Sequence, residues 1–370
     1  MTLRSNSPAH AALLVASCLL FGHATAETPA VADLVDRADW SERAIIDSAA
    51  LHADDVGATS YVRGVAARVC AEVAPTARVW LYAHDDAFTF ALPNGAVFIS
   101  IGMLGRVMSE AELAALLARE CVAAGAVTVL DSRKWSGGFW IFAVSASKQP
   151  LLPTLWSPST IRGVGAEKEE SIDAEVISAM IKAGYNPYAA SMIFDRLSRD
   201  AKRVHSSQPF QAANADAMQR RAASLHALAS AHARTGDDLP APLQRELRGV
   251  VSELYERYLT FGRQSDALEL LSVDGRAEFW KGRGAYWLGE AYRRAGLTAD
   301  LARAVDAYTR SLESAVPEPR ALAALGRLRL KEGHRAEARR LLQSYLASVP
   351  NAPDAGLIER ELHELGPEPQ

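Results

Sequence analysis

The chain has 370 residues, apolar residues make up 49% of it, and its formal net charge is −4. This length is ample for a buried core and predicts two domains, since single domains usually hold about 100–200 residues. The slightly acidic balance and the lack of a basic tract exclude a typical nucleic-acid-binding protein.

The N-terminus has the pattern of a secretory signal peptide. A charged start at Arg4 precedes an apolar run over 11–22, and small residues follow up to Ala26. We therefore expect residues 1–26 to be removed and the mature protein to be periplasmic. An alternative uses Cys18 as the acceptor of a lipid anchor, which would make an outer-membrane lipoprotein. No other segment has the roughly 20 apolar residues that a bilayer span needs.

Apolar residues recur at helical spacing over 33–73, which predicts helices in this region. Removal of the signal peptide leaves two cysteines, Cys70 and Cys121, an even pair in an oxidising compartment. A disulfide between them and two small buried side chains are both compatible with the sequence, because spacing alone does not show proximity.

Three short strands and a long helix come next. The segment 77–83 alternates between apolar and polar residues, and 88–91 and 96–100 read as strands on either side of a turn at 92–95. The following helix is expected to begin at Ser109, whose Ser-Glu-Ala-Glu sequence supplies an N-cap and acidic residues in the first turn.

The run from Phe88 to Gly125 resembles the HtpX-like and BepA-like zinc metallopeptidases, relatives of the CAAX prenyl proteases, in which a similar run leads into the H-E-x-x-H motif. The resemblance implies an α+β fold with a mostly helical gluzincin-like domain and a small sheet. In working relatives the edge of this sheet holds the substrate backbone as an additional strand.

In this chain the pentad reads Arg119-Glu120-Cys121-Val122-Ala123. The motif binds zinc because two neutral imidazoles four residues apart share one helix face, while the glutamate takes a proton from bound water. Arg119 has no lone pair to offer and Ala123 has no ligating atom. We therefore expect no metal, and Glu120 is expected to be a vestigial general base.

The resemblance returns over 167–187, where the family carries its third zinc ligand. It places that ligand at Glu169 and a neighbouring carboxylate at Asp173. We hypothesise that the Arg119 guanidinium pairs with Glu169 or Asp173 and replaces the zinc ion as a structural bridge. The alternative is an Arg119 side chain on an exposed helix face.

Two further family elements are less well matched. A family H-P-x-x-x-x-R segment aligned on Arg221 puts Ala215 and Asp216 at its histidine and proline. A stretch rich in tryptophan, glycine and proline over 132–165 lies where relatives have a lid, and an irregular loop explains it equally well.

The polar stretch 233–242 is a candidate boundary, which gives a peptidase-like domain over 27–235 and a helical domain over 243–366. Similar segments end at Gly296 and Gly333, 37 residues apart, and a second helix follows each. This resembles the tetratricopeptide units of BepA-like proteins and predicts a surface for a protein or peptide partner. Helical hairpins that only cap the domain are the alternative.

Three functions are compatible with these observations. The first is a periplasmic pseudo-metallopeptidase, a binding or scaffold protein in envelope protein assembly or quality control. The second is an active zinc metalloendopeptidase with a non-standard site that uses Glu120, Glu169 and Cys121 together with a ligand from a partner. The third is a lipoprotein subunit that regulates an intact homologous peptidase. Zinc is expected only under the second, and the sequence favours the first.

Overall fold

A computed structural model describes residues 31–47, 56–127, 166–203, 215–232, 235–296 and 298–366. The fold is α+β, mostly helical with one three-stranded sheet, as the sequence predicts. The predicted signal peptide, the lipid-anchor alternative and the tryptophan-rich segment lie outside the described residues and stay predictions.

The sheet has the strand order β1-β3-β2. Strand β1 (Arg78–Tyr82) is parallel to β3 (Ala96–Ser100), and β2 (Thr89–Ala91) is antiparallel to β3. In the turn between β2 and β3, the Gly95 N–H donates to the Leu92 carbonyl at 2.9 Å, and Gly95 has a φ of 82°, which glycine adopts without strain. The predicted strands and their turn are confirmed.

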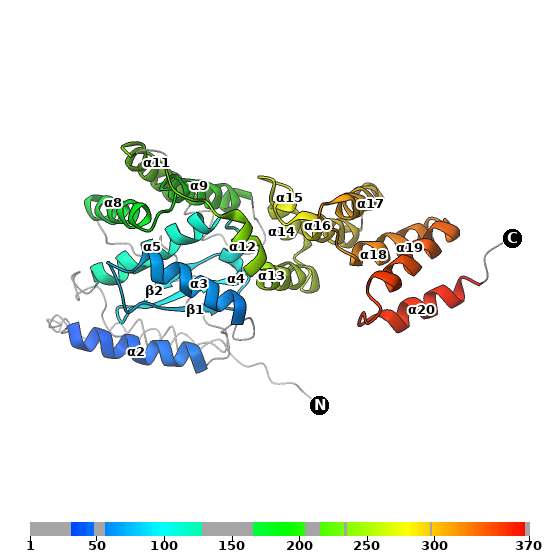
Figure 1. Cartoon of the computed structure of the whole chain (residues 1–370), viewed down its shortest axis with the longest axis horizontal. Coiled ribbons are helices and arrows are strands. Elements are labelled where there is room, and N and C mark those ends of the chain that lie inside the picture. Colours follow the sequence, from blue (N-terminus) through cyan, green and yellow to red (C-terminus); the bar gives the residue numbers. More distant parts are fainter. Residues whose placement is uncertain are drawn as a thin grey trace, which may run out of the picture.

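Helices cover both faces of the sheet (Figure 1). Helix α2 (Val31–Asp47) lies on one face, where Ala38 and Ile45 share an apolar cluster with aromatic residues of β2 and β3. Helices α3 (Val56–Val69) and α5 (Glu110–Val127) pack against the other face. The sheet is therefore the middle layer of this part of the molecule.

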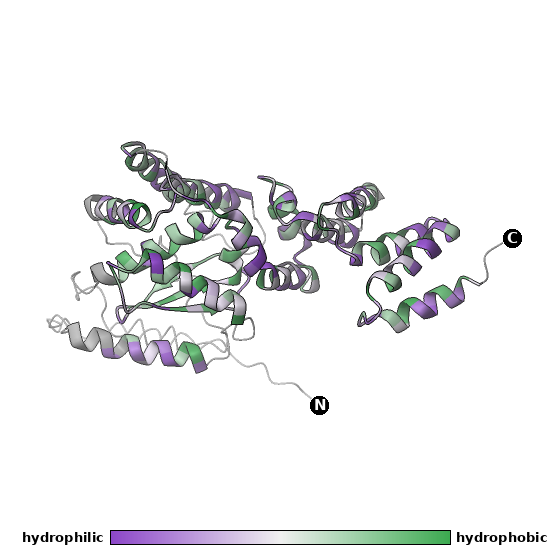
Figure 2. Cartoon of the chain, viewed as in Figure 1, coloured by the Kyte–Doolittle hydropathy of each residue, from purple (hydrophilic) through white to green (hydrophobic). Residues whose placement is uncertain are grey.

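Helix α5 is buried on every side. Each residue from Ser109 to Ala124 is buried, because α8 (Ala166–Lys182), α9 (Tyr188–Arg203) and α11 (Ala215–Ser230) form a further layer beyond α5. Figure 2 shows the matching hydropathy, with α5 mostly green and white. A helix that is apolar on all sides belongs in a core, so any charged residue on α5 needs a buried partner.

The start of α5 follows the predicted pattern. A short helix α4 (Ile101–Leu104) leads from β3 towards it. The Ser109 hydroxyl accepts from the Glu112 N–H at 3.1 Å, and the Glu112 carboxylate accepts from the Met108 N–H at 2.7 Å. This reciprocal arrangement satisfies N–H groups that the first helical turn leaves without backbone acceptors.

The polar stretch at the predicted boundary is hydrogen-bonded into the fold. The carbonyls of Asp238 and Leu239 accept from the N–H groups of Ala111 and Glu110 at 3.2 and 3.4 Å, and so cap α5. The Asp237 backbone exchanges hydrogen bonds with Gly184 and Asn186 at 3.0 and 3.2 Å. This stretch therefore does not act as a free linker over its described residues.

Two helices follow, α12 (Pro240–Glu246) and α13 (Arg248–Thr260). They are separated at Leu247, which has a φ of −93° and a ψ of 1°. The Leu247 side chain is fully buried at the break. Leu247 itself is neither proline nor glycine, and Gly249 follows two residues later.

The rest of the chain forms helical hairpins, in the order α14 (Gln264–Leu271), α15 (Arg276–Phe279), α16 (Lys281–Ala295), α17 (Thr298–Glu313), α18 (Arg320–Lys331), α19 (Arg335–Ser348) and α20 (Ala355–Glu364). Four glycines at helix ends have positive φ values of 74°, 81°, 86° and 68°: Gly262, Gly296, Gly333 and Gly366. They stand 34, 37 and 33 residues apart. The pattern therefore extends one helix pair further, to α13 and α14, than the sequence analysis found.

One apolar cluster runs from Ala58 in α3 to Ala307 in α17. Two smaller clusters lie in the last hairpins, around Tyr308 and around Leu342. The large cluster crosses the stretch 235–242 without interruption, and the predicted division into two domains stays a prediction. Among the described helices, none has the length and apolar character that crossing a bilayer requires.

Candidate functional site

Arg119, Glu120 and Ala123 lie on the buried helix α5. Their exposed fractions are 4%, 2% and 7%. The alternative in which Arg119 points into solvent is therefore wrong, because the layer of α8, α9 and α11 covers this part of α5.

The Glu120 carboxylate accepts two hydrogen bonds on the same oxygen. Arg119 Nη1 donates to Oε1 at 2.8 Å, and the Thr89 hydroxyl of β2 donates to Oε1 at 2.8 Å. Arg119 Nε is buried and has no acceptor among the described residues. A permanent cation therefore holds the carboxylate that would activate water in the resembled family.

Asp173 pairs with Arg221 and not with Arg119. Arg221 donates to Asp173 Oδ1 from Nε at 2.9 Å and from Nη2 at 2.6 Å, and its guanidinium lies 5.3 Å from the ring centre of Phe194. The hypothesised bridge between Arg119 and Asp173 is thus wrong. The Glu169 side chain lies outside the described residues, so its pairing with Arg119 stays a prediction.

Asp173 and Arg221 belong to separate segments of the sequence, and nothing in either segment predicts their contact. Arg221 is not part of a motif that this chain preserves. It lies on helix α11, which begins with Ala215 and Asp216, the residues at the family's histidine and proline positions. The sequence signal for this contact is the opposite charge of Asp173 and Arg221. Such pairs are common on helices, so charge alone does not identify a partner.

Glu110 is a second acidic centre that sequence reasoning missed. Its carboxylate accepts from the hydroxyls of Tyr61 and Tyr185 at 2.6 and 2.7 Å and from Arg68 at 3.0 Å. Burial, together with the hydrogen bond to Glu110, raises the pKa of both tyrosines. The first turn of α5 is thereby tied to α3 and to the turn after α8, which fixes the direction of the helix that carries Glu120.

A buried cluster of charges lies between α5, α9 and the loop before α15. Arg276, with no exposed surface, donates to Asp200 at 2.9 and 3.2 Å and to the Leu270 carbonyl at 2.9 Å. Arg106 lies 3.7 Å from Asp200, and Arg196 pairs with Glu112. These contacts join helices α5 and α9 to the first helical hairpin, and no sequence motif indicates them.

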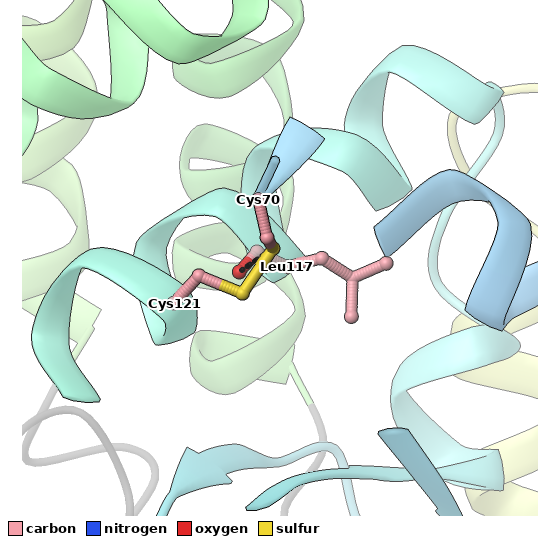
Figure 3. Close-up of a disulfide and its surroundings, with 3 residues drawn as sticks. All are labelled: Cys70, Leu117 and Cys121. Carbon is pink, nitrogen blue, oxygen red and sulfur yellow. Dashed lines mark hydrogen bonds between the residues drawn. A yellow bond between two sulfur atoms is a disulfide. The ribbon is translucent and has the colours of Figure 1, made fainter. Parts of the chain in front are cut away.

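A disulfide joins Cys70 of the segment after α3 to Cys121 of α5 (Figure 3). Their Cα atoms are 5.9 Å apart, and both residues are almost fully buried. Cys70 Sγ lies 3.7 Å from the Leu117 carbonyl oxygen, a packing contact because a disulfide sulfur bears no proton. Of the two alternatives that the sequence allows, the structure has the disulfide, and it takes Cys121 away from any role as a thiolate ligand.

An open groove of about 470 Å³ lies between α3 and β1, and five of its eleven lining residues are alanine. Its lining includes Cys70, Arg63 and Trp80, and none of Thr89, Arg119 or Glu120. The Arg63 side chain donates to the Val79 carbonyl at 3.0 Å and so covers part of the β1 edge. The groove is therefore separate from the position that the motif marks.

Within the described part of the chain, no three histidine, cysteine, aspartate or glutamate side chains gather closely enough to hold a metal ion. Comparison with protein-family models and with curated protein sequences gives no match. The resemblance to the metallopeptidase family therefore rests on the sequence motifs alone.

Proposed function

We propose that the chain is a secreted or periplasmic pseudo-metallopeptidase. In this proposal it is a binding or scaffold protein that keeps a gluzincin-like cleft and tetratricopeptide-like repeats and acts in envelope protein assembly or quality control. One observation carries the proposal: the buried pair of Arg119 and Glu120. A guanidinium at the first ligand position cannot donate a lone pair, and here it binds the carboxylate that would serve as the base.

The helical hairpins support the binding part of the proposal. Positive-φ glycines recur at 34, 37 and 33 residues, close to the period of about 34 residues of tetratricopeptide repeats. Three helix pairs and a final helix meet the requirement of about three units for a stack that stabilises itself. Such stacks commonly present a concave surface to a peptide or protein partner.

The alternative, an active zinc metalloendopeptidase, loses one of its three candidate ligands. The Cys121 sulfur is bonded to Cys70, so it cannot serve as a thiolate. Catalytic zinc usually needs three protein ligands. A zinc site would then consist of Glu120, Glu169 and a further ligand supplied by a partner.

The purified mature chain is expected to hold well under one zinc ion per molecule, on the order of 0.1 or less, after exposure to zinc and dialysis. It should also leave β-casein intact, with or without a chelator, and Glu120→Gln should behave in the same way. Metal analysis by mass spectrometry and gel assays measure both. Stoichiometric zinc that Glu169→Ala removes, with cleavage that chelators stop, would establish the enzyme instead.

Among the described strands, β2 lies at one edge of the sheet, and its outer side is expected to bind extended peptide. The backbone groups of Phe88 and Leu92 form hydrogen bonds to β3. In an antiparallel pair the backbone groups of successive residues point alternately towards and away from the partner strand, so those of Thr89 and Ala91 point away from β3. Ala91→Pro removes an edge donor without breaking a bond to β3. It should weaken binding of reduced, carboxymethylated α-lactalbumin about tenfold, the effect of losing roughly 1.4 kcal/mol.

Ala91→Val is the matched control, because valine suits a strand and keeps the N–H. Surface plasmon resonance measures the affinities, and circular dichroism checks that both variants are folded. Equal binding by the proline and valine variants would show that the β2 edge takes no part.

A further inference from the structure

The loop 84–86, between β1 and β2, is in contact with the first helical hairpin. The Tyr258 hydroxyl of α13 donates to the Asp85 carbonyl at 2.7 Å, and Arg257 Nε donates to Asp85 Oδ1 at 2.5 Å. Helices α4 and α13 lie side by side next to this loop (Figure 1). The loop therefore connects the sheet directly to the helical part of the chain.

The same loop lies closely against α4. The Gly102 N–H donates to the His84 carbonyl at 2.9 Å. A Cβ atom at Gly102 would lie 2.2 Å from the Asp85 carbonyl oxygen, which is closer than any side chain can approach. The loop is thus held between α4 on one side and α13 on the other, and a change in its shape has to act on both.

Arg263, which precedes α14, links the two acidic residues of the loop. Its Nη1 lies 3.6 Å from Asp85 Oδ2, and its Nη2 lies 3.5 Å from Asp86 Oδ1. Its Nε donates to Asp266 in the first turn of α14 at 2.7 Å. The position of Asp86 therefore affects how the start of α14 is held.

The His84 imidazole fixes the shape of the loop. Its Nδ1 accepts the Asp86 N–H at 3.1 Å and lies 3.5 Å from Asp86 Oδ2, and its ring meets the Phe88 ring edge to face at 5.5 Å between centres. A ring nitrogen that accepts an N–H carries no proton, so this hydrogen bond needs neutral imidazole. The His84 side chain is 32% exposed, and protons from solvent can therefore reach it.

The surroundings of His84 favour its neutral form. Burial lowers the pKa of the imidazole and outweighs the attraction of the neighbouring carboxylates, and two guanidinium groups lower it further. The stabilisation is therefore complete above the ordinary pKa of about 6.5 and is lost as the pH falls through the lowered pKa of the folded chain. The titratable and charged groups that face the loop from the described elements are Tyr82 at the end of β1, Asp85 and Asp86 on the loop, Arg257 and Tyr258 on α13, and Arg263 and Asp266 at the start of α14.

We propose that the loop 84–86 is a pH-sensitive contact between the sheet and the helical hairpins. Protonation of His84 ends its acceptance of the Asp86 N–H, and the new cation attracts the Asp86 carboxylate away from Arg263. The ion pair between Asp85 and Arg257 remains. Mild acidity therefore loosens the contact without separating the two parts. This regulation goes beyond the proposed binding function and does not depend on it.

The test compares the full mature chain with His84→Asn by hydrogen exchange and mass spectrometry. Asparagine offers a side-chain oxygen to the N–H two residues on and does not titrate. At about pH 7.5 the two proteins should exchange alike over 83–88 and 257–266. At about pH 4.5 the native chain should exchange roughly fivefold faster there, the effect of losing one hydrogen bond. Comparison at the same pH removes the intrinsic pH dependence of exchange.

His232→Asn is the matched control, because it makes the same change at an exposed histidine outside the loop and should behave as the native chain does. A second measurement needs no variant at His84: in the nuclear magnetic resonance spectrum of the native chain, the Asp86 amide signal should shift with the same midpoint as the His84 ring signal. The inference fails if the native and His84→Asn chains exchange alike at the acidic pH, or if the Asp86 amide does not follow the His84 titration.

Discussion

Reduction of the disulfide between Cys70 and Cys121 lowers the free energy of unfolding by about 4 kcal/mol. The bond closes a loop of 51 residues, and the chain-entropy model of cross-links gives about this value for a loop of that length. The bond also joins the residue after α3 to the central helix, two elements on the same face of the sheet. Its loss therefore also loosens the support of α5.

Urea denaturation with and without a reductant measures the effect. The matched control is the double variant Cys70→Ala and Cys121→Ala, whose midpoint should not respond to the reductant. Two free thiols titrated in the native, air-oxidised protein, or an unchanged midpoint on reduction, would contradict the expectation. Protein made in a reducing compartment should correspondingly be the less stable form.

Asp200→Ala is expected to destabilise the fold by roughly 3–5 kcal/mol, because it leaves two buried guanidinium groups without their carboxylate. Asp200 is 3% exposed and receives hydrogen bonds from Arg276, while Arg106 lies within 3.7 Å. Asp306→Ala is the matched control. Asp306 pairs with Arg310 on the surface and is 69% exposed, so its loss should cost at most about 1 kcal/mol.

The two variants are compared by thermal and urea denaturation. A second variant, Asp200→Leu combined with Arg276→Met, removes both charges and should recover part of the loss, since an apolar pair often replaces a buried ion pair at little cost. If Asp200→Ala cost no more than Asp306→Ala, the cluster would have no structural role.

The elements that local chemistry determines could be predicted from the sequence. The turn before β3 needs a glycine at Gly95, and the start of α5 needs Ser109 with an acid at Glu112, so spacing alone identifies both. The three strands and the helix pairs of the C-terminal part follow from apolar periodicity and from glycines at helix ends. These features depend on neighbours within a few residues of each other.

Pairings between distant residues could not be predicted in the same way. The sequence offers Asp173 as a partner of Arg119, but in the structure Arg119 pairs with Glu120, its neighbour in the chain, and Asp173 pairs with Arg221. Every arginine can reach several carboxylates, and the choice depends on how three helices are placed.

The large apolar cluster that runs from α3 to α17 affects how the molecule unfolds. The central helix and the first hairpins share side-chain neighbours, so they should lose structure together as one cooperative unit. Helices α19 and α20 share with α18 a separate small cluster around Leu342, and we expect this end of the chain to fray while the large cluster stays intact. Amide protons of the terminal hairpin should therefore exchange with solvent well before those of α5. A partner that binds to the terminal hairpin can then order it without disturbing the sheet.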